Sequence, residues 1–345
     1  MDRLGRIATT AAERRSARYG PAMTEFEHVH VDVGGLRMHA ALSGPADGPA
    51  VLLCHGFPES WYSWRHQLRA LGEAGYRVIA PDQRGYGQTD APSEVAAYSQ
   101  LHLVGDVVGL LDALDVPSAT IVGHDWGGPV AWNSAMIRPD RFPAVVGISV
   151  PFAPRLPGAL PPTATLRAAL GDSFFYVLYF QEPGVAEAEL DGDIRATLRK
   201  TLYSISGDIP AKDFRFFDPS ARCFNDLLLE PETLPEWLTE HDLDVFTAEF
   251  ERKGTFRHAL NWYRNIDQSW ELMAAHLGKG IDSPALFIGA ERDAIFGLTP
   301  ERVLATRQWV PKLRDPIWVP DCGHWIQQEE PEVVNNALLE FLATA

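Results

Sequence analysis

The stretch Ile121-Val122-Gly123-His124-Asp125-Trp126-Gly127-Gly128 decides the fold. An apolar run leads into an acidic residue between glycines and continues as a helix pattern, which is typical of a strand joined to a helix by a sharp turn. Gly123 and Gly127 suit this turn because a Cβ atom there would clash with the neighbouring strand or helix. We expect Asp125 at the tip of the turn, with its carboxylate aimed away from the sheet. A helix-capping aspartate would fit the same stretch.

Strand and helix patterns alternate on either side of this turn. Two segments of alternating polarity, Phe26–Val33 and Leu36–Leu42, flank Gly34-Gly35 and predict a β-hairpin. Further strands are predicted at Ala50–Cys54, Arg77–Ala80, Thr120–Gly123, Ala144–Val150, Ala285–Gly289 and Pro316–Val319, and helices at Trp61–Glu73, Gln100–Leu114, Pro129–Ile137, Pro300–Gln308 and Pro331–Leu342. This order predicts an α/β fold with a mostly parallel sheet and helices on both faces.

The alternation is interrupted between Phe152 and Asn265. This segment has no strand pattern, and its helical stretches are rich in aromatic residues: Phe174, Phe175, Tyr176, Tyr179, Phe180, Phe214, Phe216, Phe217, Phe224 and Trp237. We therefore predict a helical insertion at residues 152–265, inside an α/β core formed by residues 25–151 and 266–345. Above the carboxyl ends of the strands it would be a lid over an apolar pocket. A separate helical domain is the alternative.

Composition excludes several classes of partner. The chain has 345 residues, with 46 acidic and 30 basic side chains and a net charge of −16. This argues against binding to nucleic acid, which needs a basic surface, and against an anionic membrane surface. No apolar run approaches the roughly 20 residues that span a bilayer. The cysteines, Cys54, Cys223 and Cys322, are odd in number and lack metal-ligand spacing, so we expect reduced thiols, no metal and a cytoplasmic location.

Residues 1–24 differ from the rest of the chain. Five arginines lie there among alanines and threonines, with few acidic residues. We expect an extension in front of the domain, because the segment has no clean apolar face. An organellar transit peptide has a similar composition.

The candidate chemistry starts from Asp125. A carboxylate in this turn can attack an sp³ carbon and form an ester, whose hydrolysis then needs a general base held by an acid. His324 follows the last predicted strand and Asp293 follows the preceding one, so both should lie at the same edge of the sheet as Asp125. The order nucleophile, acid, histidine is that of α/β-hydrolases. Glu291 and Asp315 are rival candidates for the acid.

Two backbone amides and two tyrosines complete the candidate site. A tetrahedral intermediate needs N–H donors, and we expect them from Trp126, next to the nucleophile, and from Phe57 in His55-Gly56-Phe57-Pro58. Pro58 cannot donate and would instead fix the turn, for which a cis peptide bond is one option. A strained ether oxygen leaves more easily with a neutral hydroxyl donor. Tyr176 and Tyr263, near the two ends of the insertion, are candidates for that role, with packing as the alternative.

These motifs together resemble one family, the soluble epoxide hydrolases of the α/β-hydrolase fold. The resemblance runs from about Phe26 to the C-terminus. The stretches that carry it are HGFPESWYSW at 55–64, GHDWGG at 123–128, YVLYFQEPG at 176–184, LNWYRN at 260–265 and DCGHW at 321–325. The two tyrosine segments are the specific part, because the Asp125 turn is shared with other aspartate hydrolases. Mammalian members carry a further N-terminal domain, so a bacterial-type member is the closer comparison.

The resemblance implies a two-step reaction without a cofactor. The substrate would be a small apolar or lipid-like epoxide, water the second reactant and a vicinal diol the product; a homodimer is left open. The residues implied are Asp125 as nucleophile, Tyr176 and Tyr263 as donors to the epoxide oxygen, His324 and Asp293 as base and orienting acid, and Phe57 and Trp126 as oxyanion-hole amides.

Other classes of protein share some of these residues. A haloalkane dehalogenase would use the same Asp, His and Trp126, but its oxyanion loop often offers Asn or a second Trp where this chain has Phe57. A fluoroacetate-type dehalogenase would have Arg beside the nucleophile. A hormone-receptor-like binding protein on a hydrolase scaffold would not need the complete Asp125, Asp293 and His324 set. A serine esterase is disfavoured because the chain has no Gly-x-Ser-x-Gly.

Overall fold

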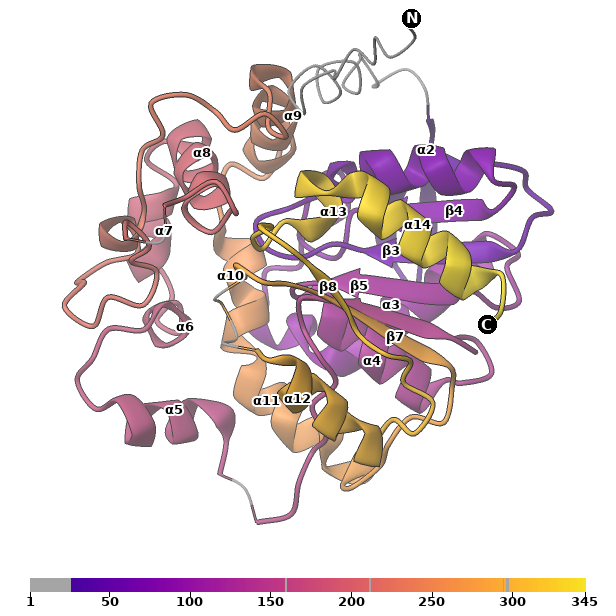
Figure 1. The fold of residues 1–345 in the computed structure, drawn as a ribbon. Coiled ribbons are helices and arrows are strands. Elements are labelled where there is room, and N and C mark those ends of the chain that lie inside the picture. The colour runs from indigo at the N-terminus through magenta and orange to yellow at the C-terminus, as the bar shows by residue number, and fades with distance from the viewer. Residues whose placement is uncertain (1–25, 159, 211, 294, 296–297) are drawn as a thin grey trace, which may run out of the picture.

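A mixed sheet of eight strands forms the centre of the computed structural model, which describes residues 26–158, 160–210, 212–293, 295 and 298–345 (Figure 1). The expected extension at residues 1–24 lies outside the described residues. The strand order is β1-β2-β4-β3-β5-β6-β7-β8. The strands are β1 (Glu27–Val33), β2 (Leu36–Ser43), β3 (Ala50–Cys54), β4 (Arg77–Pro81), β5 (Thr120–His124), β6 (Val145–Ile148), β7 (Ala285–Ala290) and β8 (Ile317–Val319). The predicted hairpin is confirmed as the antiparallel pair β1–β2, and all pairs from β4 to β8 are parallel.

Helices cover both faces of this sheet, as predicted. On one face α2 (Arg65–Glu73) packs against α14 (Pro331–Leu342), and on the other α3 (Gln100–Ala113) packs against α4 (Gly127–Ile137) (Figure 1). The residues of β6 and β7 are all buried, as are those of β3 and β5 after the first. Burial on both faces explains why these strands appear in the sequence as continuous apolar runs rather than alternating ones.

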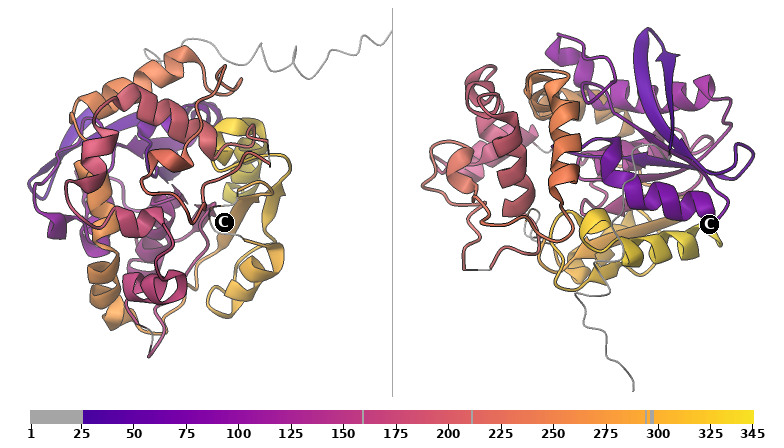
Figure 2. Two further views of the ribbon diagram at one scale, coloured as in Figure 1. Left: turned by 90° about the vertical axis from the view of Figure 1, so that its left-hand side faces the viewer. Right: turned by 90° about the horizontal axis from the view of Figure 1, so that it is seen from above.

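A largely helical segment enters between β6 and β7 and stands over the carboxyl ends of the parallel strands (Figures 1 and 2). Its α-helices up to residue 265 are α5 (Pro162–Leu170), α6 (Tyr176–Tyr179), α7 (Val185–Leu190), α8 (Ile194–Ser204), α9 (Glu240–Glu251) and α10 (Arg257–Arg264). No strand occurs in the described part of residues 152–265. The next helix, α11 (Ile266–Leu272), packs on α3 and α5 and so connects the segment to the core.

Several predicted boundaries differ from the structure by one residue, and four elements differ more. The strand expected at Ala144–Val150 is only Val145–Ile148, because Ser149 has a φ of 67° and turns the chain out of the sheet. The helix expected at Trp61–Glu73 begins with a 3₁₀ turn at Trp61–Trp64. The helix expected from Pro129 begins at Gly127, two residues earlier. The helix expected at Pro300–Gln308 is α12 (Pro300–Leu304), followed by a 3₁₀ turn, Ala305–Gln308.

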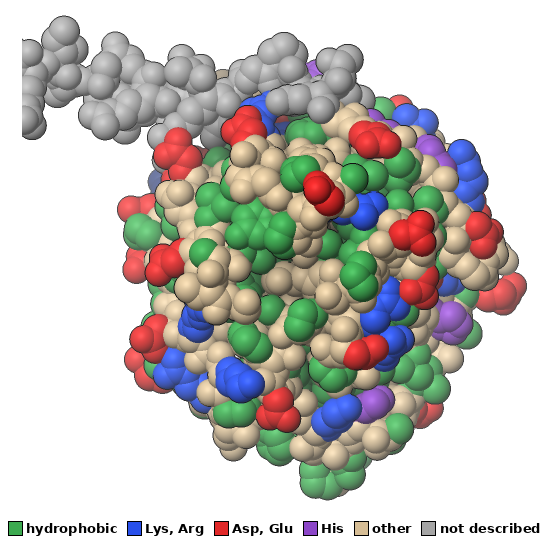
Figure 3. Space-filling view, turned by 90° about the vertical axis from the view of Figure 1, so that its right-hand side faces the viewer, with side chains coloured by type: hydrophobic (Ala, Val, Ile, Leu, Met, Phe, Trp, Pro, Cys, Tyr) green, Lys and Arg blue, Asp and Glu red, His purple; other side chains and the backbone are tan. Residues whose placement is uncertain are grey.

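The end of the molecule opposite the helical segment carries mixed charge. Acidic and basic side chains are interspersed on its described surface instead of forming a patch of one sign (Figure 3). None of the helices in the described ranges is both long enough and apolar enough to cross a bilayer.

Candidate active site

The turn after β5 has the strained geometry that its glycines indicate. Asp125 has a φ of 48°, in the left-handed region that side chains rarely adopt. A Cβ atom on Gly123 would lie 2.0 Å from the carbonyl oxygen of Gly127, and one on Gly127 would lie 2.0 Å from that of Cys54. Gly56 faces the carboxylate, and a Cβ atom there would lie 2.4 Å from Asp125 Oδ1. Close packing therefore leaves no room for a side chain at Gly123, Gly127 or Gly56.

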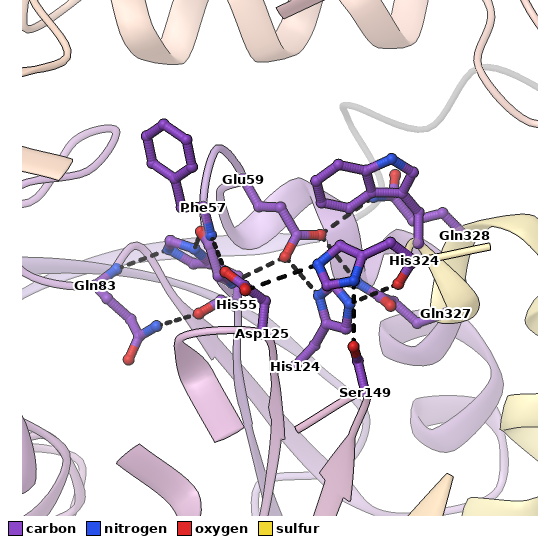
Figure 4. A network of polar contacts seen from close by, with 12 residues as sticks. His55, Phe57, Glu59, Gln83, His124, Asp125, Ser149, His324, Gln327 and Gln328 are labelled. Atoms are coloured by element: carbon purple, nitrogen blue, oxygen red, sulfur yellow. Dashed lines mark hydrogen bonds and ion pairs between the residues drawn. The ribbon is translucent and has the colours of Figure 1, made fainter. Parts of the chain in front are cut away.

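Each oxygen of the Asp125 carboxylate faces one of the predicted partners. The Phe57 amide donates to Oδ1 at 2.7 Å, and His324 Nε2 lies 3.7 Å from Oδ2 (Figure 4). The Phe57–Pro58 peptide bond is cis. Trp126 follows Asp125 directly and leads into α4.

His324 contacts one of the three acids that the sequence left open. Its Nδ1 lies 3.1 Å from Asp293 Oδ2, whereas Glu291 is exposed and Asp315 pairs with Arg307 at 2.7 Å. Sequence patterns did not single out Ser149, although it completes this cluster. Its hydroxyl donates to Asp293 Oδ2. The same hydroxyl lies 3.1 Å from His324 Nδ1 (Figure 4). The positive φ of Ser149 directs the chain toward this pair, and an apolar strand pattern gives no sign of it.

The paired carboxylates dominate the protonation of His324. Burial would lower its pKa, but the negative charges of Asp293 and Asp125 outweigh burial and raise the pKa to about 10. Burial would raise the pKa of Asp293, but the nearby His324 and the hydrogen bonds to that carboxylate lower it below its ordinary value. The raised pKa favours the protonated form of His324 in the resting site.

Tyr176 and Tyr263 face the same carboxylate from the helical segment. Tyr176 begins α6 and Tyr263 lies in α10, and their ring centroids are 6.0 Å apart. Burial, together with the charge on Asp125, raises the pKa of both hydroxyls above its ordinary value. Tyr263 also packs edge-to-face on Trp126, with 5.0 Å between ring centroids. Both tyrosines thus remain neutral hydrogen-bond donors at working pH.

These groups line one narrow cavity of about 20 Å³ between the sheet and the helical segment. Its polar side chains are Asp125, His324, the two tyrosines and Thr201. The rest of the lining is apolar: Phe57, Ile205, Phe216, Phe224 and Ile295. Among the described residues, no group of three or more His, Cys, Asp or Glu side chains is arranged to hold a metal ion.

A buried polar network lies beneath the cavity and was not predicted from the sequence (Figure 4). Glu59 accepts from His124 Nδ1 at 2.7 Å and from the side-chain amides of Gln327 and Gln328 at 2.9 and 3.2 Å. His124 Nε2 donates to the carbonyl oxygen of His324 at 2.8 Å. The network therefore ties the loop of Phe57, the turn of Asp125 and the loop of His324 into one unit.

The loop that presents Phe57 has a support of its own. His55 Nδ1 donates to the carbonyl oxygen of Gly56 at 2.9 Å, and its Nε2 accepts from the Gln83 amide at 3.1 Å. Gln83 returns a side-chain hydrogen bond to the His55 carbonyl oxygen. Burial lowers the pKa of His55, which keeps the ring neutral in this arrangement.

Comparison with known proteins identifies the fold family of the chain. Residues 49–198 match the family model for the alpha/beta hydrolase fold, in agreement with the sheet order and the turn at Asp125. Epoxide hydrolase A of Mycobacterium tuberculosis is 45% identical over 314 residues, covering 90% of this chain and 96% of that protein. Epoxide hydrolase 1 of Siraitia grosvenorii is 42% identical, covering 93% and 99%.

Solved structures agree with these relatives. The crystal structure of Epoxide Hydrolase A from Mycobacterium thermoresistibile superposes with a TM-score of 0.86 at 45% identity, over 92% of this chain and 98% of that chain. An epoxide hydrolase from an endophytic Streptomyces gives 0.87 at 45% identity, over 92% and 95%. The chain belongs to the epoxide hydrolases of the α/β-hydrolase fold.

Proposed function

We propose that this enzyme hydrolyses a small apolar epoxide to a vicinal diol through an ester on Asp125. One arrangement carries the proposal: two tyrosine hydroxyls, a carboxylate and an acid-paired histidine line a single cavity whose remaining lining is apolar except for Thr201. The segment that bears Tyr176 and Tyr263 acts as a lid over the carboxylate. No cofactor takes part in either step.

In the first step Oδ2 of Asp125 attacks one ring carbon, and the bond from that carbon to the epoxide oxygen breaks. Oδ2 is the attacking atom because the Phe57 amide already binds Oδ1 at 2.7 Å. Tyr176 and Tyr263 donate hydrogen bonds to the epoxide oxygen and supply the proton that the alkoxide takes up, which solvent then replaces. The product of this step is a neutral hydroxyalkyl ester.

The second step uses the change of charge that the first step causes. Ester formation removes the negative charge 3.7 Å from His324 Nε2, so the pKa of His324 falls, the ring releases its Nε2 proton to solvent and it becomes a base. Asp293 holds Nδ1, and Nε2 takes a proton from the water that attacks the ester carbonyl carbon. The amides of Phe57 and Trp126 stabilise the oxyanion on Oδ1. Collapse of this intermediate releases the diol, which carries the former Oδ2 of Asp125 and takes its last proton from His324.

Haloalkane dehalogenation is the competing reaction of the same Asp-His-Asp set. A halide leaving group needs N–H donors from side chains. The oxyanion loop of this chain has Phe57 where such a donor would stand, and the cavity contains two tyrosine hydroxyls. The tyrosine pair thus favours an oxygen leaving group. Parallel assays of diol and halide release on a small substrate panel distinguish the two reactions.

The covalent step is tested with His324→Gln. This variant should still form the ester but not hydrolyse it, so intact-mass spectrometry after addition of styrene oxide should show a stable adduct on Asp125. A single turnover of the native enzyme in ¹⁸O-water gives the second test. The first diol should carry no label from solvent, because its new oxygen comes from the protein. Label in that first diol would refute the ester mechanism.

A further inference from the structure

A buried carboxylate outside the cavity binds the backbone on both sides of the catalytic histidine. Glu329 is the last residue of α13 (Ile326–Glu329) and is only 9% exposed. Its Oε1 accepts from the Trp325 amide at 2.9 Å, and its Oε2 accepts from the Gly323 amide at 2.8 Å. The two amides flank His324, so one side chain fixes the loop immediately before and after the proposed base.

The same carboxylate also reaches the helical segment. The amide of Gly207, just beyond α8, donates to Glu329 Oε2 at 2.8 Å. The backbones meet closely here, because a Cβ atom on Gly323 would lie 2.1 Å from the Gly207 nitrogen. Three donors from two distant parts of the chain therefore converge on one carboxylate.

Two further hydrogen bonds join the histidine loop to the segment that ends α8. The amide of His324 itself donates to the carbonyl oxygen of Ile205 at 2.9 Å, and Trp325 Nε1 donates to that of Leu202 at 2.6 Å. Thr201 and Ile205, from the same stretch, line the cavity. The stretch 201–207 thus contacts the histidine loop on one side and the substrate cavity on the other.

We propose that Glu329 is a positioning residue for the water-activating step, one that makes the placement of His324 depend on the docked 201–207 stretch. The inference rests on the proposed ester mechanism. Glu329 touches neither Asp125 nor the tyrosines in the structure, so it serves hydrolysis of the ester and not its formation.

The chemistry of the site requires two acceptor oxygens at this position. Three N–H groups point at the side chain, one at Oε1 and two at Oε2. Glutamine has one acceptor oxygen and one NH₂ group, so in either orientation its NH₂ faces a backbone N–H. Aspartate keeps both oxygens but is one methylene shorter, so it reaches the three amides less well.

The experiment compares native enzyme, Glu329→Gln, Glu329→Asp and a control, Glu340→Gln. The control makes the same charge change at an exposed glutamate on α14. Each protein, in excess over styrene oxide, is mixed, quenched with acid at successive times and weighed by intact-mass spectrometry. The rise of the adduct gives the rate of ester formation, and its decay gives the rate of hydrolysis.

We expect Glu329→Gln to form the ester within about twofold of the native rate and to hydrolyse it about 100-fold more slowly, the cost of a base misplaced by about 1 Å. Glu329→Asp should recover part of the hydrolysis rate, and Glu340→Gln should match the native enzyme. Should Glu329→Gln not fold, Glu329→Asp tests the same point by slower decay with unchanged formation.

Three outcomes would overturn the inference. Decay at the native rate in both Glu329 variants would show that the carboxylate does not position His324. An equal loss in formation and decay would show a general structural role. If the native enzyme forms no adduct at all, the proposed ester mechanism fails and the inference fails with it, whereas the first two outcomes leave that mechanism intact.

Discussion

Replacement of Asp125 by asparagine should convert His324 from a resting acid into a base. The substitution keeps the shape of the side chain but removes its charge, as ester formation does in the proposed mechanism. The lost charge lies 3.7 Å from His324 Nε2 in a buried site. The expected change is therefore in the pKa of the histidine rather than in the fold.

The size of the change follows from Coulomb's law. Two unit charges 3.7 Å apart interact by about 4.5 kcal/mol at an effective dielectric constant of about 20, which corresponds to about three pKa units. The native pKa of about 10 should thus fall to about 7 in Asp125→Asn, with Asp293 still in place. At neutral pH a substantial fraction of His324 would then be unprotonated.

The assay is a pH titration of the imidazole nitrogens by ¹⁵N NMR in native enzyme and Asp125→Asn. Asp47→Asn, a substitution at an exposed aspartate, serves as the control and should leave the titration of His324 unchanged. The reasoning is refuted if His324 in Asp125→Asn still titrates near 10. The ring would then stay protonated in the ester and could not take a proton from water.

Three further predictions concern the donor hydroxyl, the turn and stability. Tyr263→Phe should slow ester formation about 10- to 100-fold, because one hydrogen bond to a developing alkoxide is lost. Stopped-flow kinetics measures this rate, and an unchanged rate would contradict the prediction. Gly123→Ala should lower the melting temperature or prevent folding, because its Cβ would lie 2.0 Å from the Gly127 carbonyl oxygen; an unchanged melting curve would mean that the backbone yields easily. The raised pKa of His324 should stabilise the fold fully below pH 6.5, and this stabilisation should be lost as the pH rises toward 10. The free energy of unfolding, measured with denaturant, should therefore fall with rising pH in the native enzyme but not in His324→Gln. Parallel pH profiles of the two proteins would count against the ion pair.

The α/β core could be predicted because the sequence patterns that mark its strands and helices are local. Strands buried on both faces appear as apolar runs, and residues that follow parallel strands meet at one edge of the sheet. The same pattern placed Asp125 and His324 at one edge of the sheet, with Asp293, Glu291 and Asp315 as candidates for the acid. The loop of Phe57 could also be expected there, because His55-Gly56-Phe57-Pro58 directly follows the third predicted strand.

The supporting polar residues could not be predicted because their partners are distant along the chain. Glu59 contacts His124, 65 positions away, and Gln327, 268 positions away. Buried glutamates and glutamines at the start of a helix look like surface residues until the tertiary fold supplies their partners. Ser149 was missed for a different reason, since a single residue with positive φ leaves no pattern in an apolar strand.

The sparse polarity of the cavity has a consequence for turnover. In the proposed reaction the epoxide offers a single weak acceptor, which the two tyrosine hydroxyls would satisfy, and its carbon skeleton would rest against the phenylalanine and isoleucine side chains of the lining. The diol product carries two hydroxyl groups. A hydroxyl that remains in the cavity without a hydrogen-bond partner loses its hydration at a cost of about 1–3 kcal/mol. Under the proposed reaction the cavity therefore binds the epoxide more favourably than the diol, and the diol dissociates into solvent.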